Sequence, residues 1–315
     1  MTLMHTHPQT HPHSHKAPRR DFLARGGAAL AAPLLGSSSA QSSEKDVSER
    51  SAQAAGPREV FDAHLHCPAE SGELWQWHKV TTDFKEFVAY LDRTGVQRGI
   101  INSQRCQQNG RPSEFIAGNR EVARYVEKYR GRFLGACVVN PLFIDEALRE
   151  MEECRKKFGF VWVGELCNYM EPSYKYTLKE FELLVDQAVK LGMVLDVNTE
   201  LEEMEYIIAK YPRATIVFTH FGDDNEYRHI FKRIDAVAKS PNCYLDTSGY
   251  GHDRMGMLEY AVKSIGEDRV LFGSDFSIND PSTVIARVEH SYLTEAQKRK
   301  ILAGNLKALL AKVGS

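Results

Sequence analysis

The chain has 315 residues, of which 43% are hydrophobic and 26% are charged, and its formal net charge is −2. A charge so close to zero argues against nucleic acid or an anionic membrane surface as a partner. The length suits one α/β barrel or two smaller domains.

The beginning of the chain has the composition of an export signal. Arg19 and Arg20 precede a weakly apolar stretch, Gly26–Leu35, and then a small-residue site that ends at Ala40. A twin arginine ahead of such a segment is typical of a Tat-type signal. We therefore predict a signal over residues 1–40 and a periplasmic or secreted protein; a disordered basic leader without an export role is the alternative.

The segment after this signal, residues 41–57, is small and polar, which predicts a flexible linker ahead of one domain over 58–315. The apolar run of the leader is too short to span a bilayer, so no membrane insertion is expected. The six cysteines are scattered, and we expect mostly reduced thiols.

Short β-rich runs alternate with amphipathic helical stretches after the linker. The predicted strands are Glu59–Leu65, Gly99–Ser103, Phe133–Val139, Phe160–Leu166, Met193–Asn198, Thr215–Thr219, Cys243–Thr247 and Arg269–Gly273. The predicted helices that follow them are Asp83–Arg93, Ser113–Tyr129, Ile144–Phe158, Thr177–Leu191, Glu200–Tyr211, Asn225–Lys239, Arg254–Ile265 and Thr294–Lys312, with Ser113 and Thr294 as N-caps.

Eight strand–helix units in succession predict a parallel sheet that closes into a single-domain (β/α)8 TIM-type barrel. An open doubly wound sheet is the alternative. It is weakened because no Gly-rich phosphate turn follows the first strand.

The first predicted strand carries two histidines that stand two residues apart. Side chains alternate along a strand, so His64 and His66 point to one face, and Asp62 is expected on that same face. Two imidazoles in this arrangement form a chelate for a metal ion. The alternatives are two surface histidines in a turn and, for Asp62, either a cap of that turn or a support for His64.

Other polar side chains fall at the ends of later strands, where barrel enzymes build their active sites. They are Glu165, Asp196, Asn198, His220, Asp246 and Asp275. A buried charge is costly without a partner, and one shared metal ion would account for most of this set. Asp246 precedes a turn-prone run, so we assign it to the turn.

Three segments together resemble the amidohydrolase superfamily, in particular its amidohydrolase-related group of smaller barrels. They are Phe61–His66, Val217–Gly222 and Val270–Phe276. The resemblance implies a divalent metal ion, usually zinc, that is held by His64, His66 and Asp275. It also implies that His220 is either a ligand or a catalytic group that contacts the substrate.

Two positions depart from the pattern of that superfamily. Asn198 stands where the fifth strand normally ends in a histidine ligand, and Glu165 stands near the position of the lysine that bridges two metal ions. An amide oxygen is a poor zinc ligand but suits harder cations. We therefore expect one metal ion, with Glu165 or His220 completing its ligands; zinc is the first choice, and manganese or another harder cation is the alternative.

The leading functional prediction is a hydrolase that cleaves a small amide, ester or lactone with a metal-activated water. Asp275 would take a proton from that water, and His220 would polarise the scissile carbonyl. A decarboxylase of a small aromatic or unsaturated acid is the second hypothesis, and a non-catalytic barrel with a decayed site is the third.

The candidate substrate contacts are Trp75, Arg105, Asn198 and His252. Trp75 and Arg105 would suit a planar anion, as the decarboxylase hypothesis requires. The expected partner is a small molecule, and whether the chain forms a homo-oligomer is left open.

Overall fold

The computed structural model describes residues 58–70, 83–222 and 227–314. All of them belong to the second of the two units into which the chain divides, Ala55–Ser315. The predicted signal and linker lie outside the described residues, and so does Trp75.

Eight parallel strands form the centre of this unit, in the order in which they occur in the sequence. They are β1 (Phe61–Cys67), β2 (Arg98–Ser103), β3 (Phe133–Cys137), β4 (Trp162–Cys167), β5 (Val194–Asn198), β6 (Ile216–Phe218), β7 (Cys243–Asp246) and β8 (Val270–Leu271). Leu65 of β1 pairs with Phe276, just after β8, and the Ala63 amide donates to the Phe272 carbonyl at 2.8 Å. These contacts close the sheet, so the barrel prediction is confirmed and the open sheet is excluded.

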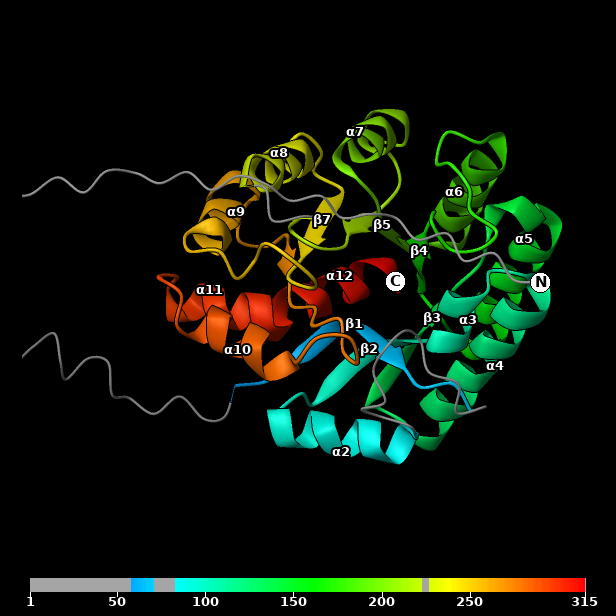
Figure 1. Cartoon of the computed structure of the whole chain (residues 1–315), viewed down its shortest axis with the longest axis horizontal. Coiled ribbons are helices and arrows are strands. Elements are labelled where there is room, and N and C mark those ends of the chain that lie inside the picture. Colours follow the sequence, from blue (N-terminus) through cyan, green and yellow to red (C-terminus); the bar gives the residue numbers. More distant parts are fainter. Residues whose placement is uncertain (1–57, 71–82, 223–226, 315) are drawn as a thin grey trace, which may run out of the picture. The chain divides into compact units, whose positions relative to one another are not determined.

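Helices surround the strands (Figure 1). They are α2 (Phe84–Thr94), α3 (Gln104–Gln108), α4 (Pro112–Lys128), α5 (Ile144–Phe158), α6 (Lys179–Leu191), α7 (Leu201–Lys210), α8 (Tyr227–Ala238), α9 (Met257–Ile265), α10 (Pro281–Glu289), α11 (Glu295–Arg299) and α12 (Asn305–Val313), with a 3₁₀ turn η1 (Pro141–Phe143) and a π-helical segment η2 (Lys300–Gly304). Across the described part of the chain, no helix has the length and the apolar content that crossing a membrane would require.

The sequence missed α3, η1 and α10, and it misplaced one cap. Ser113 is not an N-cap: α4 begins one residue earlier with Pro112 at its first turn, after Arg111 in the cap position. Proline is favoured there because its fixed φ suits the helix and its missing N–H would have had no partner. The cap at Thr294 is confirmed, since its side chain and that of Gln297 form a capping box.

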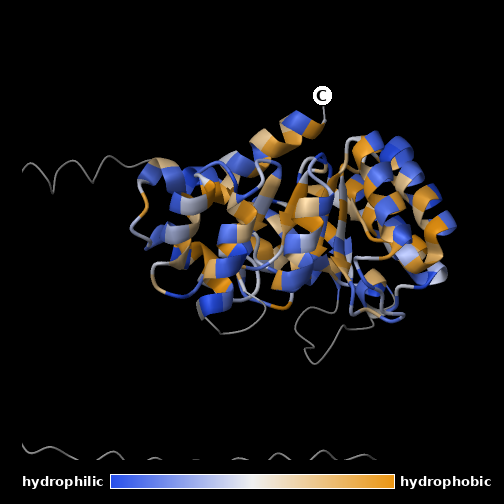
Figure 2. Ribbon diagram, turned by 90° about the horizontal axis from the view of Figure 1, so that it is seen from above, coloured by the Kyte–Doolittle hydropathy of each residue, from blue (hydrophilic) through white to orange (hydrophobic). Residues whose placement is uncertain are grey.

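The apolar residues form two shells. The outer shell lies between the strands and the helices, whose hydrophobic faces turn inward while their hydrophilic faces point outward (Figure 2). The inner shell fills the barrel with Phe61, Ala63, Ile100, Ala136, Trp162, Val194, Val217, Tyr244 and Leu271. Ala303 of η2 and Leu306 and Leu309 of α12 pack against this inner shell. Because Asn305 also donates to the Val270 carbonyl at 2.8 Å, this segment covers the end of the barrel where the strands begin.

A β-bulge in β1 changes which side chains enter the barrel. Asp62 pairs with Gly99 and Leu65 pairs with Ile101, so β1 has one more residue than β2 between these two pairs. Phe61 and Ala63 belong to the inner shell, but Leu65 belongs to the outer shell, so the alternation is broken at this point. His64 and His66 therefore face the barrel interior, and the prediction that Asp62 shares their face is wrong.

A second bulge lies in β4, between Val163 and Leu166. Trp162 is in the inner shell and Leu166 is in the outer shell, so the extra residue turns Glu165 inward. Gly164 allows this bulge: its φ is +138°, and a Cβ there would lie 2.3 Å from the Asp196 carbonyl oxygen.

Candidate metal centre

Four side-chain atoms converge at the end of the barrel where the strands finish. The Nε2 atoms of His64 and His66 lie 3.1 Å apart. Asp275 Oδ1 is 3.0 Å from His66 Nε2 and 3.6 Å from His64 Nε2. Glu165 Oε2 is 3.6 Å from His66 Nε2 and 3.7 Å from His64 Nε2.

These separations suit the ligands of a single ion. With metal–donor bonds of about 2.0–2.2 Å, neighbouring donor atoms around one cation lie about 3.0–3.5 Å apart. Two imidazoles and two carboxylates are also a donor set that zinc or manganese accepts. The four residues are almost fully buried, so no bulk water compensates the facing carboxylates.

The charges of the cluster favour a cation at its centre. Burial lowers the pKa of His64, but the carboxylates of Glu165 and Asp246 outweigh burial and hold that pKa well above its usual range. The pKa of Asp275 is lowered, because the neighbouring histidines outweigh the cost of burying its charge. Positive charge is therefore stabilised between these side chains, whether a proton or a metal ion supplies it.

Neighbouring acceptors orient both histidines of β1. His64 Nδ1 lies 3.2 Å from Asp246 Oδ2, and His66 Nδ1 lies 2.8 Å from Asn102 Oδ1. Each acceptor receives a hydrogen bond from the Nδ1–H group, so the lone pair of each histidine is on Nε2, directed at the centre of the cluster. Such partners fix the tautomer of metal-binding histidines and raise their basicity.

Asp246 also supports His220, which follows β6. Its Oδ1 accepts from the His220 amide at 3.1 Å and from the Ser248 amide at 3.0 Å, and it accepts from the Ser248 hydroxyl. Because that hydroxyl donates to Asp246, it must accept from His220 Nδ1, 2.8 Å away. In the neutral imidazole, the lone pair of His220 is therefore on Nε2.

Two residues of the site adopt the left-handed conformation that L-residues rarely adopt. The φ angle is 65° at His220 and 62° at Asp275. Asp275 is held in place because its amide donates to the His64 carbonyl at 3.0 Å and its Oδ2 accepts from Asn279 at 2.9 Å. Strained backbone of this kind persists where surrounding contacts impose it, and it is concentrated at functional sites.

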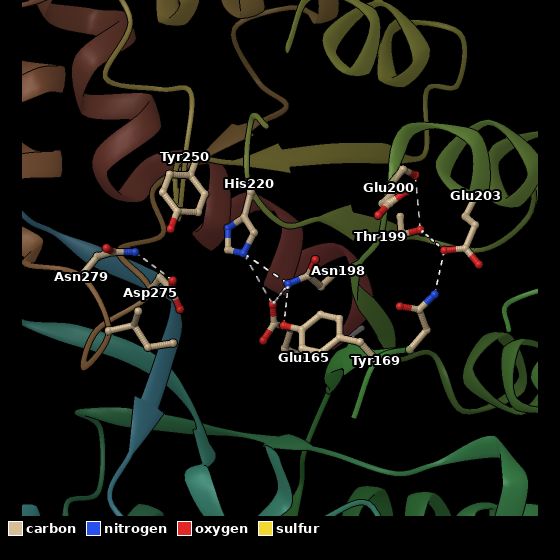
Figure 3. A pocket seen from close by; sticks show the side chains of 13 residues that line it. Glu165, Tyr169, Asn198, Thr199, Glu200, Glu203, His220, Tyr250, Asp275 and Asn279 are labelled. Carbon is tan, nitrogen blue, oxygen red and sulfur yellow. Dashed lines mark hydrogen bonds and ion pairs between the residues drawn. The ribbon is translucent and has the colours of Figure 1, made fainter. Parts of the chain in front are cut away.

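Asn198 connects the cluster to the open side of the site. Its Nδ2 lies 2.8 Å from Glu165 Oε1, 3.3 Å from Tyr169 Oη and 3.3 Å from His220 Nε2 (Figure 3). The bond to Glu165 Oε1 leaves Oε2 directed at the histidines. Asn198 therefore acts here as a donor that positions Glu165.

Two more carboxyl groups lie buried beside this cluster. Asp62 Oδ1 accepts from the amides of His64 and Ser274, and burial raises the pKa of Asp62 to about 7. Asp196 accepts from Trp162 Nε1 at 3.0 Å, and burial together with the nearby acidic groups raises its pKa to about 8. His64, Asp196 and Asp246 could also hold an ion, but His64 Nδ1 already donates to Asp246.

A cavity of about 350 Å³ opens above the cluster. It is lined by Glu165, Asn168, Tyr169, Asn198, Thr199, Glu200, Glu203, His220, Gly249, Tyr250, Asp275, Ile278 and Asn279. Its volume falls within the range of small-molecule sites, about 300–1,000 Å³.

The amidohydrolase family profile matches residues 108–311, more than half of the chain. The chain belongs to the amidohydrolase family. The match begins after β1, so membership is shown without the histidines at 64 and 66.

Decarboxylases are among the relatives of this protein. Gamma-resorcylate decarboxylase from Polaromonas sp. (strain JS666) is 26% identical over 275 residues, which cover 70% of this chain and 81% of that protein. The crystal structure of dihydroxybenzoic acid decarboxylase from Polaromonas sp. JS666, with manganese and 2-nitroresorcinol, has a TM-score of 0.64 at 20% identity and covers 81% of this chain and 97% of that chain. That of 5-carboxyvanillate decarboxylase from Novosphingobium aromaticivorans, with manganese and 4-hydroxy-3-methoxy-5-nitrobenzoic acid, has a TM-score of 0.64 at 15% identity, with coverages of 81% and 96%. At such identities the structural likeness shows the fold alone.

The structure brings some predicted site residues together and places others elsewhere. His64, His66, Glu165 and Asp275 form the cluster, and the cavity above it includes His220 and Asn198. Trp75 lies outside the described residues.

Arg105 and His252 do not line this cavity. The Arg105 guanidinium is 2.8 Å from Glu114 and 3.2 Å from Glu121, which hold it against α4. His252 is buried behind the turn after β7, and its Nδ1 has no partner among the described residues. The structure therefore gives no support to these two residues as substrate contacts, and their assignment stays a prediction.

The sequence analysis also missed residues of this site. Asn102 is the second-last residue of β2, so the same argument that selected the other strand ends would have found it. Asp246 was assigned to a turn, yet its carboxylate supports both His64 and His220. Tyr169 and Tyr250 lie on loops, where no local pattern of residues indicates which side chains turn toward the site.

Proposed function

We propose that this protein is a metal-dependent decarboxylase of a small aromatic acid. The observation that carries the proposal is the set of four ligand atoms beneath a cavity of small-molecule size, formed by His64, His66, Glu165 and Asp275. The relatives named above add support, since they are aromatic-acid decarboxylases.

One divalent cation fits these four side chains, and manganese is our first choice. Half of the donor atoms are carboxylate oxygens and none is sulfur, which suits manganese as well as zinc. When bound, the cation supplies positive charge that fixes the substrate carboxylate and stabilises the negative charge that develops as carbon dioxide leaves.

The side chains of this protein would then supply one proton to the substrate. Cleavage of the carbon–carbon bond leaves its electron pair on the ring carbon, and that carbon must take up a proton as carbon dioxide departs. We assign this proton to His220: its Nε2 atom lines the cavity, would take up a proton from solvent before each turnover and would give it to the ring carbon, while Ser248 and Asp246 hold the opposite side of the ring. Asp275, whose pKa is lowered, is a better ligand than acid.

The test combines products with metal content. The full-length protein, loaded with manganese, is incubated with hydroxylated benzoic acids and, separately, with amides, esters and lactones. We expect release of carbon dioxide from at least one acid. Hydrolysis of an amide, ester or lactone without any release of carbon dioxide would decide for the hydrolase, and no reaction at all would favour the non-catalytic barrel.

Variants separate the metal ligands from the proton carrier. His66→Ala and Asp275→Ala should lose the metal ion, measured by elemental analysis, and with it all turnover. His220→Asn should retain the metal ion and lose turnover on the order of 10²–10⁴-fold, the usual contribution of a general acid–base group. Retention of the metal ion in both ligand variants would refute the proposed centre, and His290→Ala, an exposed histidine, is the control.

A further inference from the structure

The cavity has two ends of different character. The first end is formed by the proposed metal ligands Glu165 and Asp275, beside His220. The second end lies against the beginning of α7, where the lining residues are Thr199, Glu200 and Glu203, together with Asn168. Figure 3 shows Glu200 and Glu203 on one side of Asn198 and Asp275 on the other, so the two ends are separate.

Glu203 is fixed at the second end with part of its acceptor capacity unused. Its Oε2 accepts from Asn168 Nδ2 at 2.8 Å and from Thr199 Oγ1 at 3.1 Å. Both bonds reach the same oxygen, so Oε1 is not engaged by them. The partial positive charge at the beginning of α7 favours carboxylates at this place, and Glu200 and Glu203 both benefit from it.

The charged side chains that line the cavity are all acidic among the described residues. Four of the described lining residues are carboxylates, namely Glu165, Glu200, Glu203 and Asp275, and none of the described lining residues is Lys or Arg. A divalent cation at the first end would balance Glu165 and Asp275. Glu200 and Glu203 would still present negative charge to whatever enters the second end.

We infer that the substrate is a monocarboxylate that presents a hydrogen-bond donor, an amino group above all, to Glu203. The inference rests on the proposed function for the end of the substrate that carries its carboxylate. The cavity marks the binding site, and the carboxylates at its second end select the group that it accepts. A second acid group would meet like charge there, and such contacts disfavour a ligand strongly.

Binding of two matched ligands tests the inference without relying on turnover. The probes are 4-(aminomethyl)benzoate and terephthalate, which differ in the group opposite the carboxylate. Titration calorimetry with the manganese-loaded full-length protein should give a dissociation constant at least about tenfold lower for the amine. Terephthalate binding as tightly as the amine, or neither ligand binding, would overturn the inference.

Variants of α7 assign the preference to one side chain. Glu203→Gln keeps one acceptor oxygen for Asn168 and Thr199 but removes the charge, and the preference should fall about tenfold. Glu203→Lys should reverse it. Glu202→Gln is the matched control, because this neighbour is exposed and does not line the cavity. An equal effect of Glu202→Gln and Glu203→Gln would count against the inference.

The failure of the inference is distinguishable from the failure of the proposed function. If no acid releases carbon dioxide but the amine still binds more tightly, the proposed function fails and the selectivity stands. If carbon dioxide is released and terephthalate binds as tightly as the amine, the selectivity fails and the function stands.

Discussion

Asp246 links the two sides of the site through direct hydrogen bonds. Its Oδ2 orients His64, while its Oδ1 holds the amide of His220 and the hydroxyl of Ser248. These bonds and the nearby histidines outweigh the cost of burial and lower the pKa of Asp246 to about 2. One ionised carboxylate therefore fixes a metal ligand and the proposed proton carrier together.

Asn102 should control metal affinity without touching the metal ion. Asn102→Ala removes the acceptor 2.8 Å from His66 Nδ1, and loss of such a partner typically costs 10–100-fold in affinity. Asn102→Asp keeps an acceptor and should retain most of the affinity. Competition with a chelator of known affinity measures both variants.

A matched control for this change is Asn242→Ala. Asn242 lies just before β7, at the end of the barrel where the strands begin, and its side-chain amide donates to the Pro212 carbonyl. Unchanged metal affinity in Asn102→Ala would show that Asn102 does not support the site.

His252 should make the protein less stable in acid. Burial lowers the pKa of His252 to about 4, whereas an unfolded chain has its usual value near 6.5. Between these two values the unfolded state binds a proton that the folded state does not, so the free energy of unfolding falls as the pH drops from about 6.5 toward 4.

Urea unfolding near pH 7 and near pH 5 checks this prediction. From pH 7 to pH 5 the free energy of unfolding should fall in both proteins, and the fall should be about 2 kcal/mol smaller for His252→Gln than for the wild type. His290→Gln, at an exposed position, should behave like the wild type. Parallel losses in His252→Gln and the wild type would contradict the role of His252.

Among the secondary-structure elements, the two bulges explain what the sequence could and could not predict. The order of strands and helices follows from hydrophobic periodicity, and α5 was predicted with its observed bounds. Strict alternation, however, would turn His64 and Glu165 toward the helices, and only the extra residues in β1 and β4 bring them inside. The HxH spacing found the correct pair because a bulge before His64 moves both histidines together.

Residues whose roles depend on contacts between distant parts of the chain were beyond local patterns. Arg105 was selected for its charge, but its neighbours Glu114 and Glu121 are supplied by α4. Asp246 was assigned by its turn-prone neighbours, although β1 and the segment after β6 supply the partners that make it part of the site. Tertiary packing decided each case.

The turn after β7 should position His220. Gly249 has a φ of +60°, and a Cβ there would lie 2.3 Å from His220 Nδ1. Gly249→Ala should therefore displace the ring and reduce turnover on the order of 100-fold, while the metal content is retained.

Gly256→Ala controls for backbone strain. Its φ is +85°, but no atom lies within 4 Å of the added Cβ. Both variants should lose a similar free energy of unfolding, ~1–2 kcal/mol, but only Gly249→Ala should lose activity. Equal activity of the two variants would show that the turn at Gly249 does not position the His220 ring.

For the whole molecule, metal binding and stability should be coupled. The proposed ligands come from β1, from β4 and from the segment after β8, so an unfolded chain has no comparable site. At a metal concentration 100 times the dissociation constant, binding stabilises the folded state by about 2.7 kcal/mol. Removal of the metal ion with a chelator should lower the melting temperature by several degrees, and manganese should restore it.

The variant His66→Ala provides the control for chelation. The melting temperature of this variant should not respond to the chelator, because the variant cannot bind the metal ion. A chelator effect of the same size in this variant would mean that the stabilising metal ion binds elsewhere.

The placement of η2 and α12 has a consequence for how the protein is made. Ala303, Leu306 and Leu309 are translated after all eight strands, yet they seal the apolar interior around Phe61 and Trp162. A nascent chain that has already emerged through β8 therefore still exposes that interior to water. Shortened products that stop before Ala303 should accordingly attract chaperones and proteases even though every proposed metal ligand has been synthesised.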